Sequence, residues 1–520
     1  MAERARWWAL TAVSLATLMT YLDNNVVNVA LPTIERSLHL SVSGLEWIVS
    51  SYLLVLGGLL LVGGRIADVY GRRRMFLAGV VIFTLSSLAA GLAGSGGALI
   101  AARAVQGLGG ALIMPAALAI IVATFTDTRE RTAAIGISGA VGALGLALGP
   151  ALGGIISQHL HWGWIFLINV PLGAVTLALS VPFIAESRDL APPLTGAAGQ
   201  RAASVSVSAR LDIPGLVASA LALFALTYAL IEGGDRGWTS PVIVAAFAVA
   251  AVAAGIFLVI ETRVANPMVP LPIFRNAAFS GGIGTMMIWS FGVLGIYFFT
   301  SLYLQGNLGF SPTRAGLAFV PMALCLALAA VLSPRVVPLI GANRTVALGM
   351  AVMTVALVLF AGLGAGATFG SLLPGFILFG LGAGLLNVPL TNAVIAGVPT
   401  ERAGIASALF NASREVAGLL GVTVIGAVLR ASESAALRSG THPAQAFIDG
   451  YHTGLWLTIG LSIAGVVLSY VTLRPRQRPA APASTELAAA ELGLAEVVLG
   501  EPLSELTGGA GQSAGAEPER

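Results

Sequence analysis

Charged residues are scarce in this chain, and lysine is absent altogether. Charged residues make up 10% of the 520 residues, whereas a soluble domain carries roughly 25% to cover its surface. Hydrophobic residues reach 57%, and the mean hydropathy is +0.90. A chain this apolar cannot cover a globule with polar surface, so lipid has to be its solvent. The scarcity of charge predicts an all-α integral membrane protein.

Other absences exclude several classes of function. The one cysteine, Cys325, cannot form an internal disulfide. No long basic run with interleaved aromatics occurs, which argues against nucleic-acid binding. No glycine-rich phosphate loop ending in Lys-Ser or Lys-Thr is present, which excludes ATP hydrolysis by this chain. None of the five histidines has a metal-site spacing with a cysteine or carboxylate. We therefore expect no metal and no cofactor.

Long apolar runs are what the chain does have. Runs of about 20 residues, each able to span roughly 30 Å as a helix, fall near 7–31, 45–63, 76–94, 98–122, 133–157, 164–185, 211–231, 241–260, 279–303, 314–333, 345–363, 369–393, 403–429 and 453–473. The first run lacks a small-residue cleavage site, which favours a retained helix over a signal peptide. None shows the alternation of a membrane barrel. The sequence thus predicts fourteen transmembrane helices.

The arginines give an independent test of this topology. If both termini lie in the cytoplasm, two of the 27 basic residues fall within spans and most of the others lie on the inside. Five fall outside: Arg36, Arg236, Arg314, Arg430 and Arg438. This asymmetry is what the positive-inside rule expects, and it predicts a multi-pass protein of the plasma (inner) membrane with both termini cytoplasmic.

The chain also repeats itself. Three matches occur in order at nearly one offset: Gly64–Arg74 with Pro334–Arg344, Glu130-Arg131 with Glu401-Arg402, and Gly107–Pro115 with Gly380–Pro389. Repeated bundles around a central cavity are typical of transporters, because one half can rock against the other. The predicted organisation is a six-helix bundle at 1–185, a cytoplasmic linker at 186–210, two inserted helices at 211–260, a second six-helix bundle at 261–473 and a disordered cytoplasmic tail at 474–520.

Several motifs resemble those of one family. Gly64–Arg74 fits the loop motif of the major facilitator superfamily, and ALIAARAVQGLGGA at 98–111 resembles its span-4 motif. GLALGPALGG at 145–154 resembles its antiporter motif, while LDNNVVNVALP at 22–32 and WGWIFLINVP at 162–171 resemble signatures of the fourteen-span drug:proton antiporters. The resemblance covers residues 7 to about 473. Asn24-Asn25 departs from the family pattern, and Pro338 replaces the aspartate in the second loop copy.

The resemblance implies roles for two glycine-containing segments. The loop residues Gly64, Asp68, Gly71, Arg72 and Arg73 would form a conformational latch, with Asp68 capping the next helix; the alternative is that the arginines only fix topology. The second segment is span 5, where Gly142, Gly145, Gly149 and Gly153 line one face, Pro150 predicts a kink, and Gly154 completes the antiporter-like motif. Small residues allow close helix packing, and in the family this face helps to seal one side against leak.

Four charges are predicted to lie deep in the membrane: Asp23, Arg103, Arg414 and Glu415. Each costs about 2.5–3.5 kcal/mol at mid-membrane, so none is placed there without a use. Asp23 and Arg103 have similar depths and can pair, and separating them would change the affinity of the carboxylate for a proton. We expect proton or substrate coupling at Asp23 and Arg103, against a structural ion pair. Arg414 and Glu415 are about 100° apart on one helix, which predicts that they point to different partners, one toward the cavity and one toward a neighbouring helix. For Glu415 we expect a second protonation or cation-binding site, with a structural partner as the alternative.

Polar and aromatic residues of the spans are candidates for a substrate cavity: Asn24, Asn28, Trp289, Tyr297 and Asn387. Helix packing and hydrogen bonds between helices are the alternative for each.

The leading hypothesis is a proton-coupled antiporter that exports hydrophobic or amphipathic small molecules by alternating access and functions as a monomer. One rival is a proton-coupled importer, against which the antiporter-like motif argues. The other is an intramembrane enzyme, which would need paired carboxylates with a metal ligand, or a Ser-His pair, and the sequence offers neither.

Overall fold

The computed structural model describes residues 3–187, 212–264, 267–399 and 403–474, and the regular structure in these residues is helical. The first group of helices comprises α1 (Glu3–Leu38), α2 (Val42–Tyr70), α3 (Arg72–Gly91), α4 (Gly96–Thr124), α5 (Thr128–His159), α6 (Trp164–Leu167) and α7 (Asn169–Phe183). Two helices follow, α9 (Ile213–Arg236) and α10 (Pro241–Arg263). The last group comprises η2 (Leu271–Arg275), α11 (Ala277–Leu302), η3 (Tyr303–Asn307), α12 (Pro312–Ala318), α13 (Val320–Ile340), α14 (Ala342–Ala361), α15 (Phe369–Ala396), α16 (Ala403–Arg438) and α17 (Pro443–Thr472).

These helices confirm a multi-pass membrane protein. Thirteen described segments are long and apolar enough to cross a bilayer, and α1 makes the fourteenth membrane-length helix. Helix α1 is not among the thirteen because Asp23 and three asparagines interrupt its apolar run. Helix α10 exposes Val244, Val252 and Leu258, as expected of a helix that faces lipid. Most of the predicted linker and nearly all of the predicted tail lie outside the described residues.

Helix α16 ends later than predicted, and this corrects one arginine. The helix continues to Arg438, nine residues past the predicted boundary, and α17 begins at Pro443 rather than 453. Arg430 was expected in an external loop. It lies inside α16 instead, with an exposed fraction of 8%. The polar turn after Arg430 contains good helix formers and no glycine before Gly440, so the helix outlasts its apolar run.

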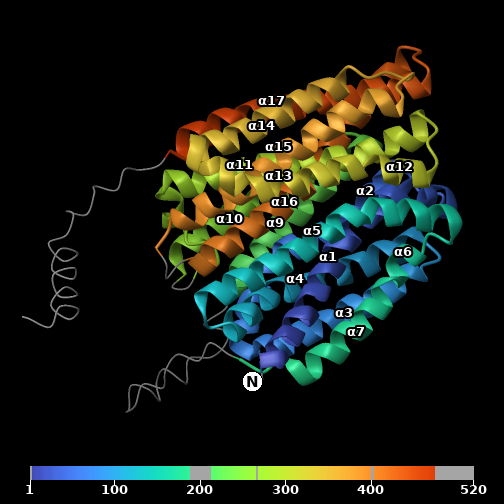
Figure 1. The fold of residues 1–520 in the computed structure, drawn as a ribbon. Helices are drawn as coiled ribbons and strands as arrows, with labels where there is room; N and C mark the ends of the chain where they lie inside the picture. The colour runs from blue at the N-terminus through green and yellow to red at the C-terminus, as the bar shows by residue number, and fades with distance from the viewer. Residues whose placement is uncertain (1–2, 188–211, 265–266, 400–402, 475–520) are drawn as a thin grey trace, which may run out of the picture. The chain divides into compact units, whose positions relative to one another are not determined.

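The predicted repeat is visible in how the helices pack (Figure 1). In the N-terminal bundle, α1–α7, α1 packs on α5 while α2 and α3 pack on α4. In the C-terminal bundle, α11–α17, α11 packs on α16 while α13 and α14 pack on α15. The equivalent turns also match, because Gly71 and Gly341 both adopt positive φ and donate their N–H to the preceding helix. The fold is two six-helix bundles with two inserted helices.

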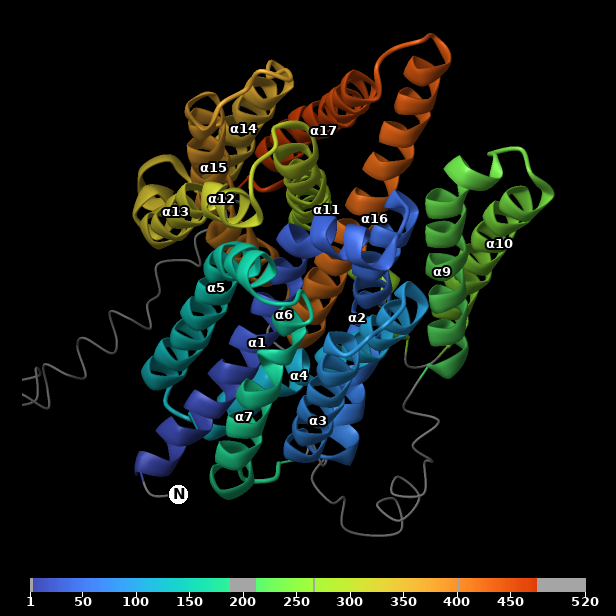
Figure 2. The same cartoon turned by 90° about the vertical axis from the view of Figure 1, so that its right-hand side faces the viewer.

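The inserted pair lies against the seam between the bundles. Helix α9 packs against α2 of the first bundle and α16 of the second, and α10 packs against α9. Figure 2 shows α9 beside both helices, with α10 outside it.

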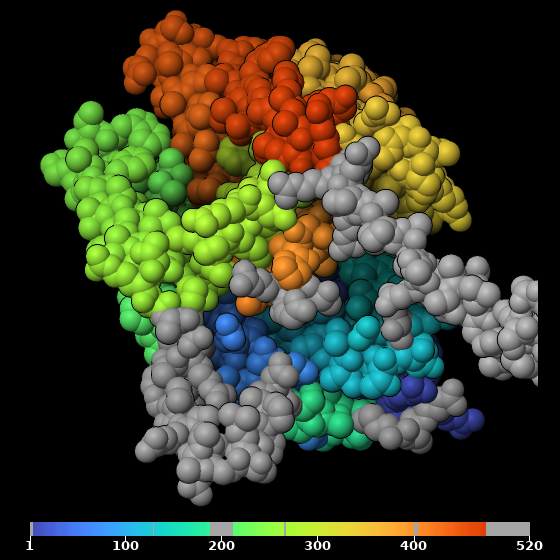
Figure 3. Space-filling view, turned by 90° about the vertical axis from the view of Figure 1, so that its left-hand side faces the viewer, coloured from blue at the N-terminus to red at the C-terminus, as the bar shows by residue number. Residues whose placement is uncertain are grey.

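The helices end at two faces. The terminal face contains the start of α1, the α2–α3 turn and the end of α17, and the opposite face contains the α1–α2, α5–α6 and α16–α17 turns. The bundles meet at the opposite face, where Gln305 Nε2 donates to the Val29 carbonyl at 2.8 Å and the Thr313 amide donates to Gln158 Oε1 at 3.0 Å. At the terminal face the surface is recessed between the bundles (Figure 3). The described residues thus form a state that is closed at the opposite face.

Candidate functional site

Asp23 of α1 and Arg103 of α4 form an ion pair in the interior of the N-terminal bundle. Arg103 NH1 lies 2.5 Å from Asp23 Oδ2, and both side chains are 0% exposed. The span-4 segment places Arg103 here because Gly107 and Gly109 bring α4 close to α2 and α3: a Cβ on either would overlap backbone atoms of the facing helix. Two charges with no access to water require further hydrogen-bond partners.

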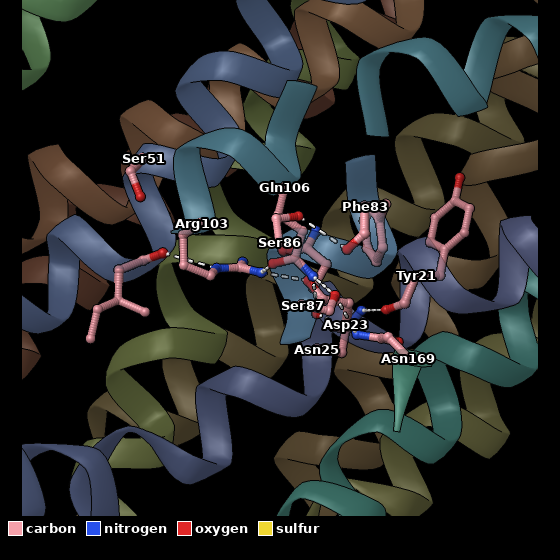
Figure 4. A network of polar contacts seen from close by, with 12 residues as sticks. Tyr21, Asp23, Asn25, Ser51, Phe83, Ser86, Ser87, Arg103, Gln106 and Asn169 are labelled. Atoms are coloured by element: carbon pink, nitrogen blue, oxygen red, sulfur yellow. Dashed lines mark hydrogen bonds and ion pairs between the residues drawn. The ribbon is translucent and has the colours of Figure 1, made fainter. Parts of the chain in front are cut away.

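Those partners come from three more helices (Figure 4). Gln106 Nε2 and Asn169 Nδ2 donate to Asp23 Oδ1 at 2.8 and 2.9 Å. The same two amides donate to Ser87 Oγ of α3. Arg103 Nε donates to the Ile48 carbonyl of α2 at 3.2 Å, and its guanidinium lies 4.3 Å from the centre of the Tyr52 ring. Five helices of one bundle therefore hold this pair.

The network determines what Asp23 can do chemically. Its carboxylate accepts three hydrogen bonds from side chains, one from Arg103 and two from the amides of Gln106 and Asn169. Binding a proton would cost Asp23 at least one of these bonds. Arg103 NH2 and Asn169 Oδ1 are buried without a partner among the described residues, so the network also retains unused hydrogen-bonding capacity. A proton on Asp23 would thus be linked to a rearrangement of its neighbours.

Arg414 and Glu415 correct a sequence-based prediction. They were expected to point to different partners, but Arg414 Nε and NH2 both donate to Glu415 Oε1, at 3.0 and 2.6 Å. The arginine side chain is long enough to fold back over its neighbour, so the angle between the two Cα–Cβ bonds does not separate the charged groups. Arg414 also lies 5.6 Å from the centre of the Tyr21 ring of α1, and Glu415 packs next to Gly57 of α2. This second pair lies at the seam of the bundles.

The glycine face of α5 packs against the same part of α1 that carries Asp23. A Cβ at Gly145 would lie 2.8 Å from the Leu18 carbonyl oxygen, and one at Gly149 would lie 2.7 Å from Asn25 Cβ. Gly153 meets the Val26 carbonyl in the same way. These contacts fix the position of the part of α1 that carries Asp23.

Two further residues of the motif face the other bundle. Gly154 lies against the Pro312 carbonyl, and the Pro150 carbonyl lies against Gly316 of α12. Side chains larger than hydrogen at the two glycines would separate the bundles here. The motif therefore contributes to the closed opposite face, as well as to packing.

The α2–α3 turn also differs from its prediction. Asp68 does not cap α3; it accepts from Arg72 Nε and NH2, at 3.2 and 3.0 Å. Glu186, expected in the linker, caps the helix by accepting from the backbone amides of Arg73 and Arg74. Gly71 has φ +116°, and a Cβ there would lie 2.5 Å from Glu186 Oε1. Gly64 lies farther back in α2 beside Pro115.

The candidate cavity residues do not form one cluster of contacts. Asn28 is buried and donates to the Asn24 carbonyl in its own helix, while its Oδ1 has no partner among the described residues. Trp289 is buried, with no partner for its Nε1 in the part of the chain that the structure describes, and Tyr297 is buried against the Phe319 ring. Asn24 and Asn387 are half-buried. Their part in substrate binding stays a prediction.

Sequence reasoning missed a third buried pair, between Glu46 of α2 and Arg430 of α16. Arg430 NH1 donates to Glu46 Oε1, and Glu46 is 0% exposed. The helix-favouring composition beyond Arg430 was the signal that would have placed this arginine inside the helix. Its partner is 384 residues away, which no local pattern reveals.

Comparison with known proteins gives a consistent result. A family model described as Major Facilitator Superfamily matches residues 13–287 and 263–422. The puromycin resistance protein pur8 of Streptomyces alboniger is 35% identical over 495 residues, covering 91% of this chain and 93% of that protein. The multidrug resistance protein Stp of Mycobacterium tuberculosis is 36% identical over 437 residues, covering 84% and 78%. The crystal structure of the POT family transporter PepTSo has the same fold, with a TM-score of 0.64 at 16% identity, covering 91% and 98%.

Proposed function

This chain belongs to the major facilitator superfamily, and from that premise we propose that it is a proton-coupled antiporter that exports hydrophobic or amphipathic small molecules. The resistance proteins that it resembles support export of toxic compounds. The observation that carries proton coupling is the Asp23–Arg103 pair, whose carboxylate is fully buried and held by donors on separate helices. A titratable charge held this deep in a membrane protein typically marks a proton or substrate pathway.

The proposed orientation places the terminal face in the cytoplasm. Arg72, Arg73 and Arg74 lie at that face, and excess arginine on the inside is what orients membrane proteins. The structure would then be the state that takes up substrate from the cytoplasm or the inner leaflet. Export follows when the bundles part at the opposite face and close at the terminal face. Both bundles that alternating access requires belong to one chain, so a monomer is the proposed working unit.

The energy available is sufficient for one proton per cycle. A proton moving through 100 mV and one pH unit supplies about 2.3 plus 1.4 kcal/mol. That supports a gradient of about 400-fold for a neutral substrate. If a monovalent cation exchanges for one proton, the membrane potential contributes nothing and only the pH difference remains. Cationic substrates would therefore favour two protons, and Glu415 is the candidate for the second site.

The test is transport in reconstituted vesicles with an imposed pH gradient and an internal pH dye. Because puromycin appears in the name of a close relative, it is a suitable first probe, within a panel of cationic and neutral compounds. We expect protons to cross the membrane in the direction opposite to the substrate. Asp23→Asn should abolish this proton movement. Proton movement in the same direction as substrate would support the importer instead. Unchanged coupling in both Asp23→Asn and Glu415→Gln would overturn the proposed proton sites.

A further inference from the structure

Three helices meet at the opposite face in a charged junction that lies apart from the candidate site. Glu46 of α2 and Arg430 of α16 are paired across the two bundles, and Arg430 also donates to the carbonyl oxygens of Leu230 and Ile231 in the inserted helix α9, at 3.2 and 3.1 Å. Gly234 allows this approach, since its backbone lies beside the Arg430 side chain. One guanidinium thus joins all three parts of the fold.

Helix α9 also has a contact with the first bundle. Trp47 Nε1 donates to Glu232 Oε1 at 3.0 Å, and the Trp47 ring packs beside the rings of Phe224 and Tyr228. Glu232 keeps a second partner within its own helix, because Arg236 Nε donates to its other oxygen at 3.0 Å. The Trp47 contact is therefore mostly aromatic packing, which can slide without leaving a charge unpaired.

Glu46 and Arg430 differ in how many hydrogen-bond partners each has. Among the described side chains, Arg430 is the one that hydrogen-bonds to Glu46, whose Oε2 has no partner. Arg430 has two backbone acceptors on α9 in addition to Glu46. Opening the opposite face must break the Glu46–Arg430 bond, because the residues belong to different bundles. Separating a buried pair is costly when a charge stays buried alone. Arg430 keeps its two backbone acceptors through the opening if α9 moves together with α16.

We propose that Glu46 and Arg430 form the gate that holds the opposite face closed, and that the inserted helices move with the C-terminal bundle to keep Arg430 hydrogen-bonded when the gate opens. Glu46 is then released toward water on the opposite side. The inserted pair is a working part of the gate rather than a lipid-facing addition. This inference rests on the alternating-access cycle of the proposed function, but it does not require proton coupling or any particular substrate.

The first experiment measures how often the opposite face opens. The native thiol is removed by Cys325→Ala, and Ser157→Cys becomes the reporter, because Ser157 is buried at the opposite face beside Pro312. A membrane-impermeant maleimide added from that side labels the reporter faster when the bundles part, because Ser157 is 6% exposed in the closed state. We expect Glu46→Gln to raise the labelling rate about tenfold, since losing a charge-assisted hydrogen bond weakens closure.

A matched control is Glu130→Gln. Glu130 pairs with Arg6 inside the N-terminal bundle, so this variant loses an ion pair without touching the seam, and its labelling rate should equal that of the parent. A parental rate in Glu46→Gln would overturn the gate. Labelling needs neither drug nor proton gradient. A normal labelling response together with absent proton-coupled export would therefore count against the proposed function and not against the gate.

The second experiment tests which bundle carries α9. A Cβ at Gly234 would lie 3.7 Å from Arg430 Cβ, a distance that a disulfide spans. Gly234→Cys with Arg430→Cys in the reporter background removes the gate charge, so rapid labelling at position 157, measured on its own peptide, is expected while the thiols at positions 234 and 430 are reduced. If α9 moves with α16, forming the disulfide leaves labelling fast. If α9 stays with α2, the disulfide ties the bundles together and labelling slows, which would overturn the role of the inserted helices. The single Ser157→Cys protein controls for effects of the oxidant.

Discussion

The two buried ion pairs of the candidate site are built in opposite ways. Asp23 and Arg103 come from different helices and are enclosed by Gln106, Asn169 and Ser87 of the same bundle. Arg414 and Glu415 are neighbours on one helix. Their side chains are 17% and 5% exposed, whereas those of the first pair are 0% exposed. Equivalent bundles therefore do not carry equivalent charges.

This difference separates two roles. The first pair has all its partners in one bundle, so a rigid-body movement of the bundles leaves its contacts intact. The second pair touches Tyr21 and Gly57 of the other bundle, so the same movement changes its surroundings directly. We infer that the first pair must be altered by a proton or a substrate, whereas the second responds to the movement itself.

The largest effect is expected from Arg103→Ala. Removing the arginine leaves Asp23 charged and buried, and breaking such a pair costs about 3–5 kcal/mol. We expect a large decrease in thermal stability in detergent, together with loss of export. Arg6→Ala is the control, because it removes an arginine from a partly exposed pair in the same bundle, where such pairs contribute about 0–1 kcal/mol. Equal losses in the two variants would mean that the Asp23–Arg103 network does not stabilise the bundle.

A smaller effect is expected from disturbing the packing of α5 against the part of α1 that carries Asp23. Gly149→Ala would place a Cβ 2.7 Å from Asn25 Cβ, and overpacking of this kind costs about 1–3 kcal/mol. The matched control is Gly139→Ala in the same helix, where a Cβ would meet nothing within 4 Å. That control should gain about 0.5–1 kcal/mol from helix propensity. Thermal unfolding of both variants measures the difference, and a stable Gly149→Ala protein would show that α1 is not held firmly.

The fold could be predicted from hydropathy and the repeat because both are local or periodic signals. Every one of the fourteen apolar runs corresponds to a helical segment in the structure. Helix ends were less predictable. Apolar content marks the part of a helix that lies in lipid, whereas Arg430 shows that a helix continues wherever its residues favour helix and no glycine or proline ends it.

The site could be predicted only in its charges. Asp23 and Arg103 stand out because a charge in an apolar run is conspicuous, but Ser87 and Asn169 look like ordinary polar residues until α3 and α7 are packed against α1. Gln106 offered a signal, since it lies one helical turn after Arg103 and so on the same face. Glu186 offered none, because its role depends on the end of α7 meeting the start of α3.

Glu415→Gln is expected to change transport more than stability. The amide oxygen of glutamine can still accept from Arg414, so the loss of stability should be about 1 kcal/mol, the difference between a charged and a neutral acceptor. The variant cannot release a proton, and it presents no negative charge to a cationic substrate. We expect reduced export of cationic compounds with near-normal export of neutral ones, measured in the same vesicles. Equal loss for both classes would show that Glu415 does not distinguish substrates by charge.

The smallest effect is expected at the seam beside the second pair. Gly57→Ala would place a Cβ 3.3 Å from Glu415 Cβ and from the Val416 amide, so the neighbours must shift by a few tenths of an ångström. Helix propensity contributes about 0.5–1 kcal/mol in the opposite direction, and the net change in stability should be close to zero. Gly58→Ala, where a Cβ would meet nothing within 4 Å, should be stabilised by the full propensity gain. If Gly57→Ala destabilises the protein as much as Gly149→Ala, the seam beside Glu415 is packed as rigidly as the helices beside Asp23. The surroundings of the second pair would then be as fixed as those of the first pair. The distinction drawn between the roles of the two pairs would not hold.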